Sequence, residues 1–289
     1  MKRDAFSQCH PAVNFVFFVG AIGFGVVIQH PAYAAAGCIF AALYYLLLRG
    51  RSAWKLILSM LPLAVLLCAI NPLFNTSGEH ILFRVFGRPY TLEALYYGMA
   101  IAAIFVLMML WFGCYNAVLT SDKFTELFGN LIPAISLLLV MVLRMIPNFF
   151  RKIKQITGAR KSIGKGVGKS DGIKSKIGQG MTVLSALTDW ALEGSVVTAD
   201  SMRARGYGSA KRTSFRIYRM TLRDWVLLAL MIFLMAGVII LGGFKAEFTP
   251  VLSVSPLNWG FAAYCVFLSI PTALHIKEAL QWRISISGI

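Results

Sequence analysis

The sequence WVLLALMIFLMAGVIILGG occupies residues 225–243 and contains no charged side chain. Five other stretches share this character, with no Lys, Arg, Asp or Glu inside them: 13–28, 32–48, 56–73, 95–114 and 258–275. A helix that crosses a bilayer needs about 17–25 predominantly apolar residues. The sequence therefore predicts an all-α fold, a polytopic membrane protein with about six transmembrane helices. A shorter run, 131–143, is predicted to be a membrane-embedded or surface helix.

The charge of the chain is concentrated in one segment. The 289 residues are 58% hydrophobic and only 14% charged, with a mean hydropathy of +0.71 and a net charge of +16. Soluble proteins carry about 25% charged residues, which argues against a soluble enzyme. Residues 144–223 hold 17 of the 28 basic residues and +13 of the net charge. We therefore divide the chain into a membrane part at 1–143, a basic cytoplasmic segment at 144–223 and a second membrane part at 224–289.

The basic residues also predict how the chain is oriented. Lysine and arginine are enriched in cytoplasmic loops. If the N-terminus is inside, 25 of the 28 basic residues fall on the inner side, and the outer loops hold Arg84, Arg88 and Lys245. Both termini are therefore predicted to be cytoplasmic. The first apolar run, followed by Ala32-Tyr33-Ala34, also resembles a cleaved signal peptide, an alternative that the charge distribution leaves open.

The basic segment is predicted to contain two long amphipathic helices. In the first, Phe149, Phe150, Ile153 and Ile156 recur at steps of three or four residues, which is the helical period. This helix is expected to begin just after Pro147, because proline suits the opening of a helix better than its middle.

The second helix is marked by apolar residues at helical spacing: Met181, Leu184, Leu187, Leu192 and Val196. It is expected to end near Arg205-Gly206, because glycine adopts the left-handed conformation that closes many helices. The two helix ends resemble each other, since Ala159-Arg160 stands 45 residues before Ala204-Arg205.

An arginine after an alanine at a helix end has two interpretations. A helix C-terminus carries a partial negative charge, so a cation there contributes about 0.3–1 kcal/mol as a simple cap. The same guanidinium can form a docking tip that holds a partner's carboxylate through two parallel hydrogen bonds. One such motif alone favours the cap, whereas two of them on the cytoplasmic side of a polytopic protein favour docking.

The sequence offers little for catalysis or for a cofactor. Residues 164–170 read GKGVGKS, but a phosphate loop needs a glycine five places before Gly168, where Ile163 stands. The four histidines are scattered, and no cysteine pair has metal-site spacing. No span carries an acidic residue of the kind that proton relays use. We therefore expect a non-catalytic chain with no cofactor and no metal.

Several passages carry a family resemblance: Asn71-Pro72-Leu73-Phe74 with Gly78, Thr91-Leu92-Glu93-Ala94-Leu95 before Tyr97-Gly98, Leu119-Thr120-Ser121, Arg144-Met145-Ile146-Pro147, Ala159-Arg160, and Ala204-Arg205-Gly206-Tyr207 followed by Arg212-Thr213. In order and placement, they resemble the transmembrane (T) component of energy-coupling-factor (ECF) transporters, the family that includes the cobalt-transport permease. The resemblance extends from Pro11 to the last span, and the Ala-Arg-Gly at 204–206 is its most specific element.

The resemblance implies a scaffold that joins two cytoplasmic ATPase subunits to a separate substrate-binding membrane (S) subunit, for uptake of a vitamin or a transition-metal ion. ATP hydrolysis is then expected in the partner subunits, and the chain itself is not an enzyme. The implied ATPase-coupling residues are Arg160 and Arg205, with Ala159, Ala204 and Gly206 shaping the tips.

The first coupling helix carries one further assignment and one departure. Arg144 and Pro147 are assigned as its structural hinge. Lys161 stands where the family pattern has a glycine after Ala-Arg. The glycine-rich stretch that begins at Gly158 is expected to supply the turn instead.

Two other functions fit parts of the sequence. A self-contained permease with a basic cytoplasmic domain would need polar residues inside its spans, which here are almost purely apolar. A membrane-tethered nucleic-acid binder would interleave basic and aromatic residues, yet Trp190, Tyr207 and Phe215 are the only aromatics between Lys152 and Arg216. Anionic lipid of the inner leaflet is a simpler partner for this charge than nucleic acid. The expected location is the cytoplasmic membrane of a bacterium or archaeon.

Overall fold

The computed structural model describes residues 5–75, 80–85, 88–129, 133–166, 172–209, 218–242, 246–247 and 253–287. Its packing divides the chain into two compact units. The first comprises Met1–Phe124 and Tyr218–Ile289, and the second comprises Thr125–Ile217. These two units are defined by packing within the chain. The boundaries at 143 and 223 were placed by charge, and they remain a prediction of where the chain leaves and re-enters the membrane.

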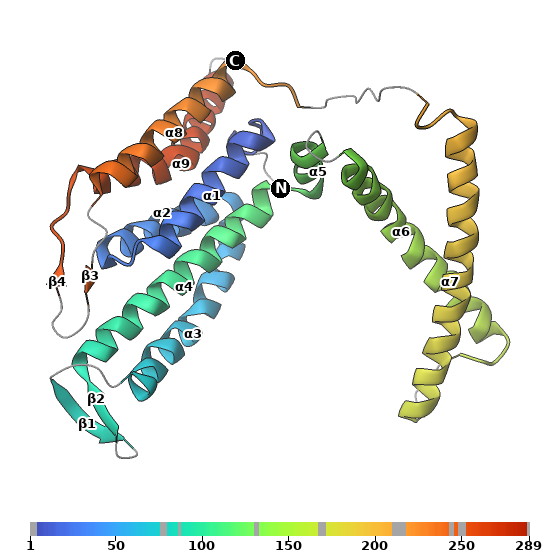
Figure 1. Cartoon of the computed structure of the whole chain (residues 1–289), viewed down its shortest axis with the longest axis horizontal. Helices are drawn as coiled ribbons and strands as arrows, with labels where there is room; N and C mark the ends of the chain where they lie inside the picture. The colour runs from blue at the N-terminus through green and yellow to red at the C-terminus, as the bar shows by residue number, and fades with distance from the viewer. Residues whose placement is uncertain are drawn as a thin grey trace. The chain divides into compact units, whose positions relative to one another are not determined.

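The first unit is a bundle of apolar helices (Figure 1). They are α1 (Pro11–Val27), α2 (Pro31–Arg49), α3 (Ala53–Phe74), α4 (Leu92–Val118), α8 (Leu222–Leu241) and α9 (Trp259–Ser287), with a short 3-10 turn, η1 (Gly50–Ser52), between α2 and α3. Each helix overlaps one of the six charge-free stretches of the sequence, and several helices extend beyond them to charged residues. This correspondence follows from hydropathy, because a long run without charge is stable as a helix in an apolar environment.

Two His-Pro dipeptides start the first two helices. The ring nitrogen Nδ1 of His10 accepts the backbone N–H of Ala12, and Nδ1 of His30 accepts that of Ala32, both at 3.2 Å. The proline that follows each histidine fits the first helical position, where its missing N–H is not needed. Two of the four histidines are thus explained as helix caps.

Aromatic side chains fill the centre of this bundle. Phe17 of α1 stacks on Phe267 of α9 at 5.1 Å and meets Trp111 of α4 edge-to-face at 5.4 Å. Phe6, from the segment before α1, packs edge-to-face on Phe17 at 5.3 Å. All four rings are fully buried. They join helices that are far apart in the sequence, which fixes the order of the bundle.

Four described stretches are long and apolar enough to cross a membrane: Pro31–Phe74, Leu92–Val118, Leu222–Leu241 and Trp259–Glu278. The first contains both α2 and α3, and α1 is a shorter apolar helix of 17 residues. Large apolar side chains such as Phe233 and Ile240 are 74% and 79% exposed, a surface that suits lipid rather than water. The chain is a helical, polytopic membrane protein.

Two short antiparallel strand pairs, which the hydropathy pattern did not predict, occupy loops of the first unit. β1 (Ile81–Val85) pairs with β2 (Arg88–Thr91) between α3 and α4, and β3 (Ala246–Glu247) pairs with β4 (Ser253–Val254) between α8 and α9. Both strand pairs lie in loops that connect helices, where a few backbone hydrogen bonds hold two short strands together. The fold is therefore still all-α in class.

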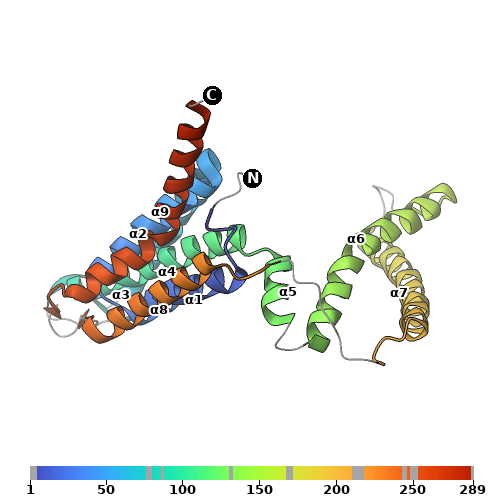
Figure 2. The same ribbon diagram turned by 90° about the horizontal axis from the view of Figure 1, so that it is seen from above.

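The second unit is built on two long helices, α6 (Pro133–Ser162) and α7 (Ile173–Ala204), and a shorter helix, α5 (Ser121–Gly129), leads from the first unit toward them. One predicted boundary was wrong, because α6 runs through Pro147 instead of starting after it. An internal proline removes one backbone hydrogen bond and bends a helix, and the ribbon of α6 changes direction along its length in Figure 2. The apolar run before Arg144 and the amphipathic helix after it are thus one continuous helix.

Candidate docking ends of the basic helices

The two long helices run in opposite directions and meet at an aromatic contact. Trp190 of α7 meets Phe149 of α6 edge-to-face at 5.7 Å, and the ammonium of Lys152 lies 5.4 Å from the centre of the indole ring. Further along α6, Thr157 lines the same cavity as Val183 of α7. Aromatic pairs and cation–π contacts each contribute about 0.5–1.5 kcal/mol. This contact at Trp190, which the sequence did not single out, lies between the two helices, whose ribbons cross in Figure 1.

The end of α7 is closed by a Schellman motif, as the glycine at 206 predicted. The N–H of Gly206 donates to the carbonyl of Arg203 at 2.9 Å, and that of Tyr207 donates to Met202 at 3.0 Å. Gly206 has a φ of 72°, the left-handed conformation that this motif requires. Arg205 is the capping residue and is exposed at the tip of the helix.

The end of α6 is closed by the same motif, three positions later relative to its arginine. The N–H of Gly164 donates to the carbonyl of Lys161 at 3.1 Å, and that of Lys165 donates to Arg160 at 2.9 Å. Gly164 has a φ of 73°. The expectation that a downstream glycine replaces the one missing at 161 is therefore confirmed. Since the helix continues through Lys161, Arg160 lies inside its last turn rather than at the cap.

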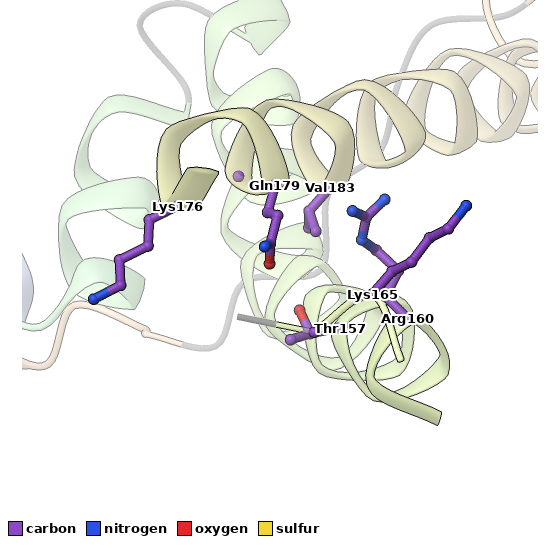
Figure 3. Close-up of a pocket in the computed structure, with 8 residues that line it drawn as sticks. Thr157, Arg160, Lys165, Lys176, Gln179 and Val183 are labelled. Carbon is purple, nitrogen blue, oxygen red and sulfur yellow. The ribbon is translucent and has the colours of Figure 1, made fainter. Parts of the chain in front are cut away.

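A cavity of about 220 Å³ lies beside Arg160, between the two helices. Its lining residues come from the end of α6 and the first turns of α7: Thr157, Arg160, Lys165, Gly166, Lys176, Gln179, Gly180 and Val183. Figure 3 shows the side chains of Arg160 and Lys165 extending together toward α7, whereas Lys176 extends away from them. No Asp or Glu lines the cavity, and residues 133–166 and 172–188 contain none.

The surroundings of Arg205 differ. The last turns of α7 carry Asp200, which pairs with Arg203 at 4.0 Å; the two side chains are 67% and 84% exposed. Asp189 and Glu193 lie further back on the same helix. An exposed pair at this distance contributes about 0.2–1 kcal/mol, so its main effect is to offset the positive charge near the tip.

The two arginines are far apart because the helices are antiparallel. Arg160 lines the same cavity as Val183, and α7 continues from there to Ala204. At about 1.5 Å of rise per residue, this stretch puts the α6 and α7 ends roughly 30 Å apart. The two arginine-bearing ends are therefore separate sites on the helix pair.

The apolar residues that marked α7 in the sequence are uncovered in the structure. Met181, Leu184, Leu192 and Val196 are all exposed. Arg144 and Pro147, the predicted hinge, are also exposed on α6. Within the described parts of the chain, no three His, Cys, Asp or Glu side chains lie close enough together to hold a metal ion.

Sequence reasoning missed two residues of the α6 end. It matched Ala159-Arg160 to Ala204-Arg205 by residue type, whereas the helix closes at Gly164 and brings Lys165 next to Arg160. The signal that identifies them is the glycine itself, because the first left-handed glycine after a helix marks its C′ position.

Two sequence comparisons relate this chain to known proteins. Residues 6–215 match the family described as cobalt transport protein, CbiQ. The chain is also 25% identical, over 208 residues, to the energy-coupling factor transporter transmembrane protein EcfT of Staphylococcus aureus (strain 04-02981), a match that covers 67% of this chain and 77% of the relative.

The matched range includes α1 to α7 with both arginine-bearing ends and stops before α8. Of the residues on which the sequence resemblance rests, Gly78, Arg212 and Thr213 lie outside the described residues. Because the family match covers well over half of the 289 residues, the chain belongs to the cobalt transport protein (CbiQ) family.

Proposed function

We propose that the chain is the transmembrane scaffold of an ECF-type importer for a micronutrient, a vitamin or a transition-metal ion. Membership of the cobalt transport protein family and the relative named as an ECF transmembrane protein support this function. The observation that carries it is structural: two long helices, pinned at Trp190, end in arginines roughly 30 Å apart. One rigid element can thereby engage two cytoplasmic ATPase subunits at once.

In the proposed topology, six transmembrane helices place both termini and the pair α6–α7 in the cytoplasm. The placement of 25 of the 28 basic residues on the inner side supports this orientation. Basic residues near the membrane would then also meet anionic lipid of the inner leaflet.

Each coupling residue has a distinct part in this proposal. Arg160 and Arg205 bind carboxylates of the ATPases, which charge-assisted, two-point hydrogen bonding by guanidinium favours. Ala159 and Ala204 keep the necks of the helices narrow, and Gly206 lets the chain turn away directly after Arg205. Arg144 and Pro147 form the hinge of α6, since an internal proline is a natural site for bending.

The scaffold transmits motion rather than catalysing a reaction. ATP binding and hydrolysis reside in the partner subunits, and closure of the ATPase pair moves the two helix ends. The exposed apolar residues of α7, with the small residues Ala186, Ala191 and Ala199 on the same helix, form the surface on which the separate S subunit packs and slides. Burying this apolar surface against the S subunit stabilises the complex by about 25 cal/mol per Å².

Co-purification with candidate ATPase subunits encoded by neighbouring genes tests the proposal. Arg160→Glu and Arg205→Glu should each weaken retention of the ATPases, and the double variant should abolish it together with uptake. Loss of one partner of a buried charge pair costs about 2–5 kcal/mol, and reversal costs at least as much. Arg151→Glu is the matched control, because Arg151 is exposed on α6 and bonds Asn148, away from the end.

Two results would contradict the proposal. One is a double variant that still retains the ATPases and supports uptake, since the arginines would then have no docking role. The other is substrate transport by the purified chain alone in proteoliposomes, which would identify a self-contained permease.

A further inference from the structure

We propose that the two docking ends recognise chemically different surfaces. The α6 end, defined here as residues 157–166 with 176–183 of α7, binds a cluster of carboxylates on its ATPase. The α7 end, residues 200–208, presents one arginine to a surface with little net negative charge. This inference rests on the proposed function and names the partner chemistry at each of its two contacts.

The first argument is the position of each arginine relative to its helix cap. Arg205 is the capping residue of α7, so its side chain leaves the helix at the tip. Arg160 lies three residues before the cap of α6, and its side chain reaches across to α7. The α6 end is therefore a cleft made by two helices, whereas the α7 end is a single projecting tip.

The second argument is the charge inside the cleft. Arg160 and Lys165 both line a cavity of about 220 Å³. No acidic side chain lines that cavity, and Lys174 and Lys176 follow in the first turn of α7. The N-terminus of α7 begins at Gly172 without a side-chain cap or an acidic residue in its first turn. The partial positive charge of a helix N-terminus adds to this potential.

The α7 end carries much less positive charge. Residues 200–208 contain Asp200 against Arg203 and Arg205, a net charge of +1, whereas the α6 end contains Arg160, Lys161, Lys165 and Lys176 and no acidic residue, a net charge of +4. One of the two cations at the α7 end, Arg203, is already paired with Asp200. Complementary charge across an interface favours binding, and like charge opposes it. A strongly acidic partner surface therefore fits the cleft at α6 better than the tip of α7.

The third argument favours a protein over a free anion or a membrane. Ile163, Ile173 and Ile177, each within three residues of a lining residue in the sequence, are 69%, 79% and 61% exposed. A small anion would leave this apolar rim in water, whereas a protein groove would bury it. A helix that lies on an anionic membrane carries basic residues along its whole polar face, while the second half of α7 is acidic.

The experiment measures ATPase binding through each end separately. In nanodiscs, the Arg205→Glu chain binds through the α6 end, and the Arg160→Glu chain binds through the α7 end. Screening weakens contacts between several opposite charges most, because the Debye length falls from about 10 Å at 0.1 M salt to about 3 Å at 1 M. We expect binding by the Arg205→Glu chain to fall steeply with added salt and binding by the Arg160→Glu chain to change little.

A second pair of variants isolates Lys165. Added to Arg205→Glu, the change Lys165→Glu should lower ATPase affinity by at least roughly fivefold, as expected for loss of an exposed pair worth about 1 kcal/mol. Lys154→Glu is the control with the same charge change, because Lys154 is exposed on α6 and does not line the cavity.

The outcomes separate the inference from the proposed function. If no chain retains an ATPase, the proposed function fails. If both single-end chains bind with the same salt dependence, or Lys165→Glu and Lys154→Glu act alike, the docking function stands and the inference is overturned. If Lys165→Glu instead abolishes binding to phosphatidylglycerol vesicles and leaves ATPase affinity unchanged, the cleft binds lipid, which also overturns it.

Discussion

Replacing Gly206 by alanine should loosen the end of α7 without removing any docking side chain. Gly206 has a φ of 72°, and a Cβ added there would lie 3.2 Å from Oγ of Ser209. An L-residue other than glycine costs about 1–2 kcal/mol in this conformation. Opening of the last turn should therefore become roughly 5- to 30-fold more frequent, since about 1.4 kcal/mol corresponds to a factor of ten.

Hydrogen exchange of the closing amides measures this change directly. The N–H groups of Gly206 and Tyr207 donate to Arg203 and Met202 in the folded cap, so in Gly206→Ala their exchange should accelerate by the same factor. Gly194→Ala is the matched control, because nothing lies within 4 Å of a Cβ added there. Alanine in the middle of a helix is favoured over glycine by about 0.5–1 kcal/mol, so this variant should slow exchange.

The same experiment also tests whether the cap serves docking. If Arg205 must be held at a closed helix end, Gly206→Ala should weaken ATPase retention while Gly194→Ala leaves it intact. An unchanged exchange rate at residue 207 would refute the reasoning from the left-handed glycine. Faster exchange with unchanged retention would separate the cap from the docking role of Arg205.

Three further predictions concern packing. Gly98→Ala should lower the melting temperature in detergent, because the added Cβ would lie 2.8 Å from the backbone oxygen of Cys68. Overpacking of this kind costs about 1–3 kcal/mol. Gly23→Ala is the control and should leave the melting temperature unchanged, because nothing lies within 4 Å of a Cβ added there. Lys123→Met should also destabilise the fold, since the buried ammonium bonds the carbonyls of Ser7 and Val118 and each orphaned acceptor costs about 1–3 kcal/mol. Equal melting of either variant and the wild type would contradict these two assignments. Trp190→Ala should keep the ATPases bound but reduce uptake, measured on the same preparation, because it unpins α6 from α7; unchanged uptake would contradict the pin.

The membrane helices were predictable because one physical quantity decides them. A run such as 225–243 contains no charge to hydrate, so its length and hydropathy alone identify a helix, and α8 lies where the run does. The start of α6 was not predictable in this way. Proline favours the first turn of a helix, but the residues on both sides of Pro147 also favour helix. The continuous helix therefore forms despite the cost of about 3 kcal/mol for an internal proline.

The candidate site shows the same difference between residue type and geometry. The order of the motifs was enough to identify Arg160 and Arg205. The position of each arginine relative to the end of its helix depends on which glycine adopts the left-handed conformation. The repeated His-Pro dipeptides at 10–11 and 30–31 indicate two helix N-termini. The sequence interpretation missed them because it treated histidine only as a metal ligand or a catalytic residue. A cavity shared by α6 and α7 depends on the Trp190 contact, which no local pattern contains.

The position of that contact has a mechanical consequence for the proposed scaffold. From Phe149 to Arg160 along α6 the distance is roughly 16 Å, and from Trp190 to Arg205 along α7 it is roughly 22 Å, at about 1.5 Å per residue. If the pair rotates about the ring contact, Arg205 moves about 1.4 times as far as Arg160. The shorter arm carries the basic cleft and the longer arm carries the single arginine. The α6 end is thus suited to hold its ATPase firmly, while the α7 end makes the larger movement when the ATPases close. Charge reversal at Arg160 should therefore impair assembly most, and charge reversal at Arg205 should impair coupling of ATP hydrolysis to uptake most.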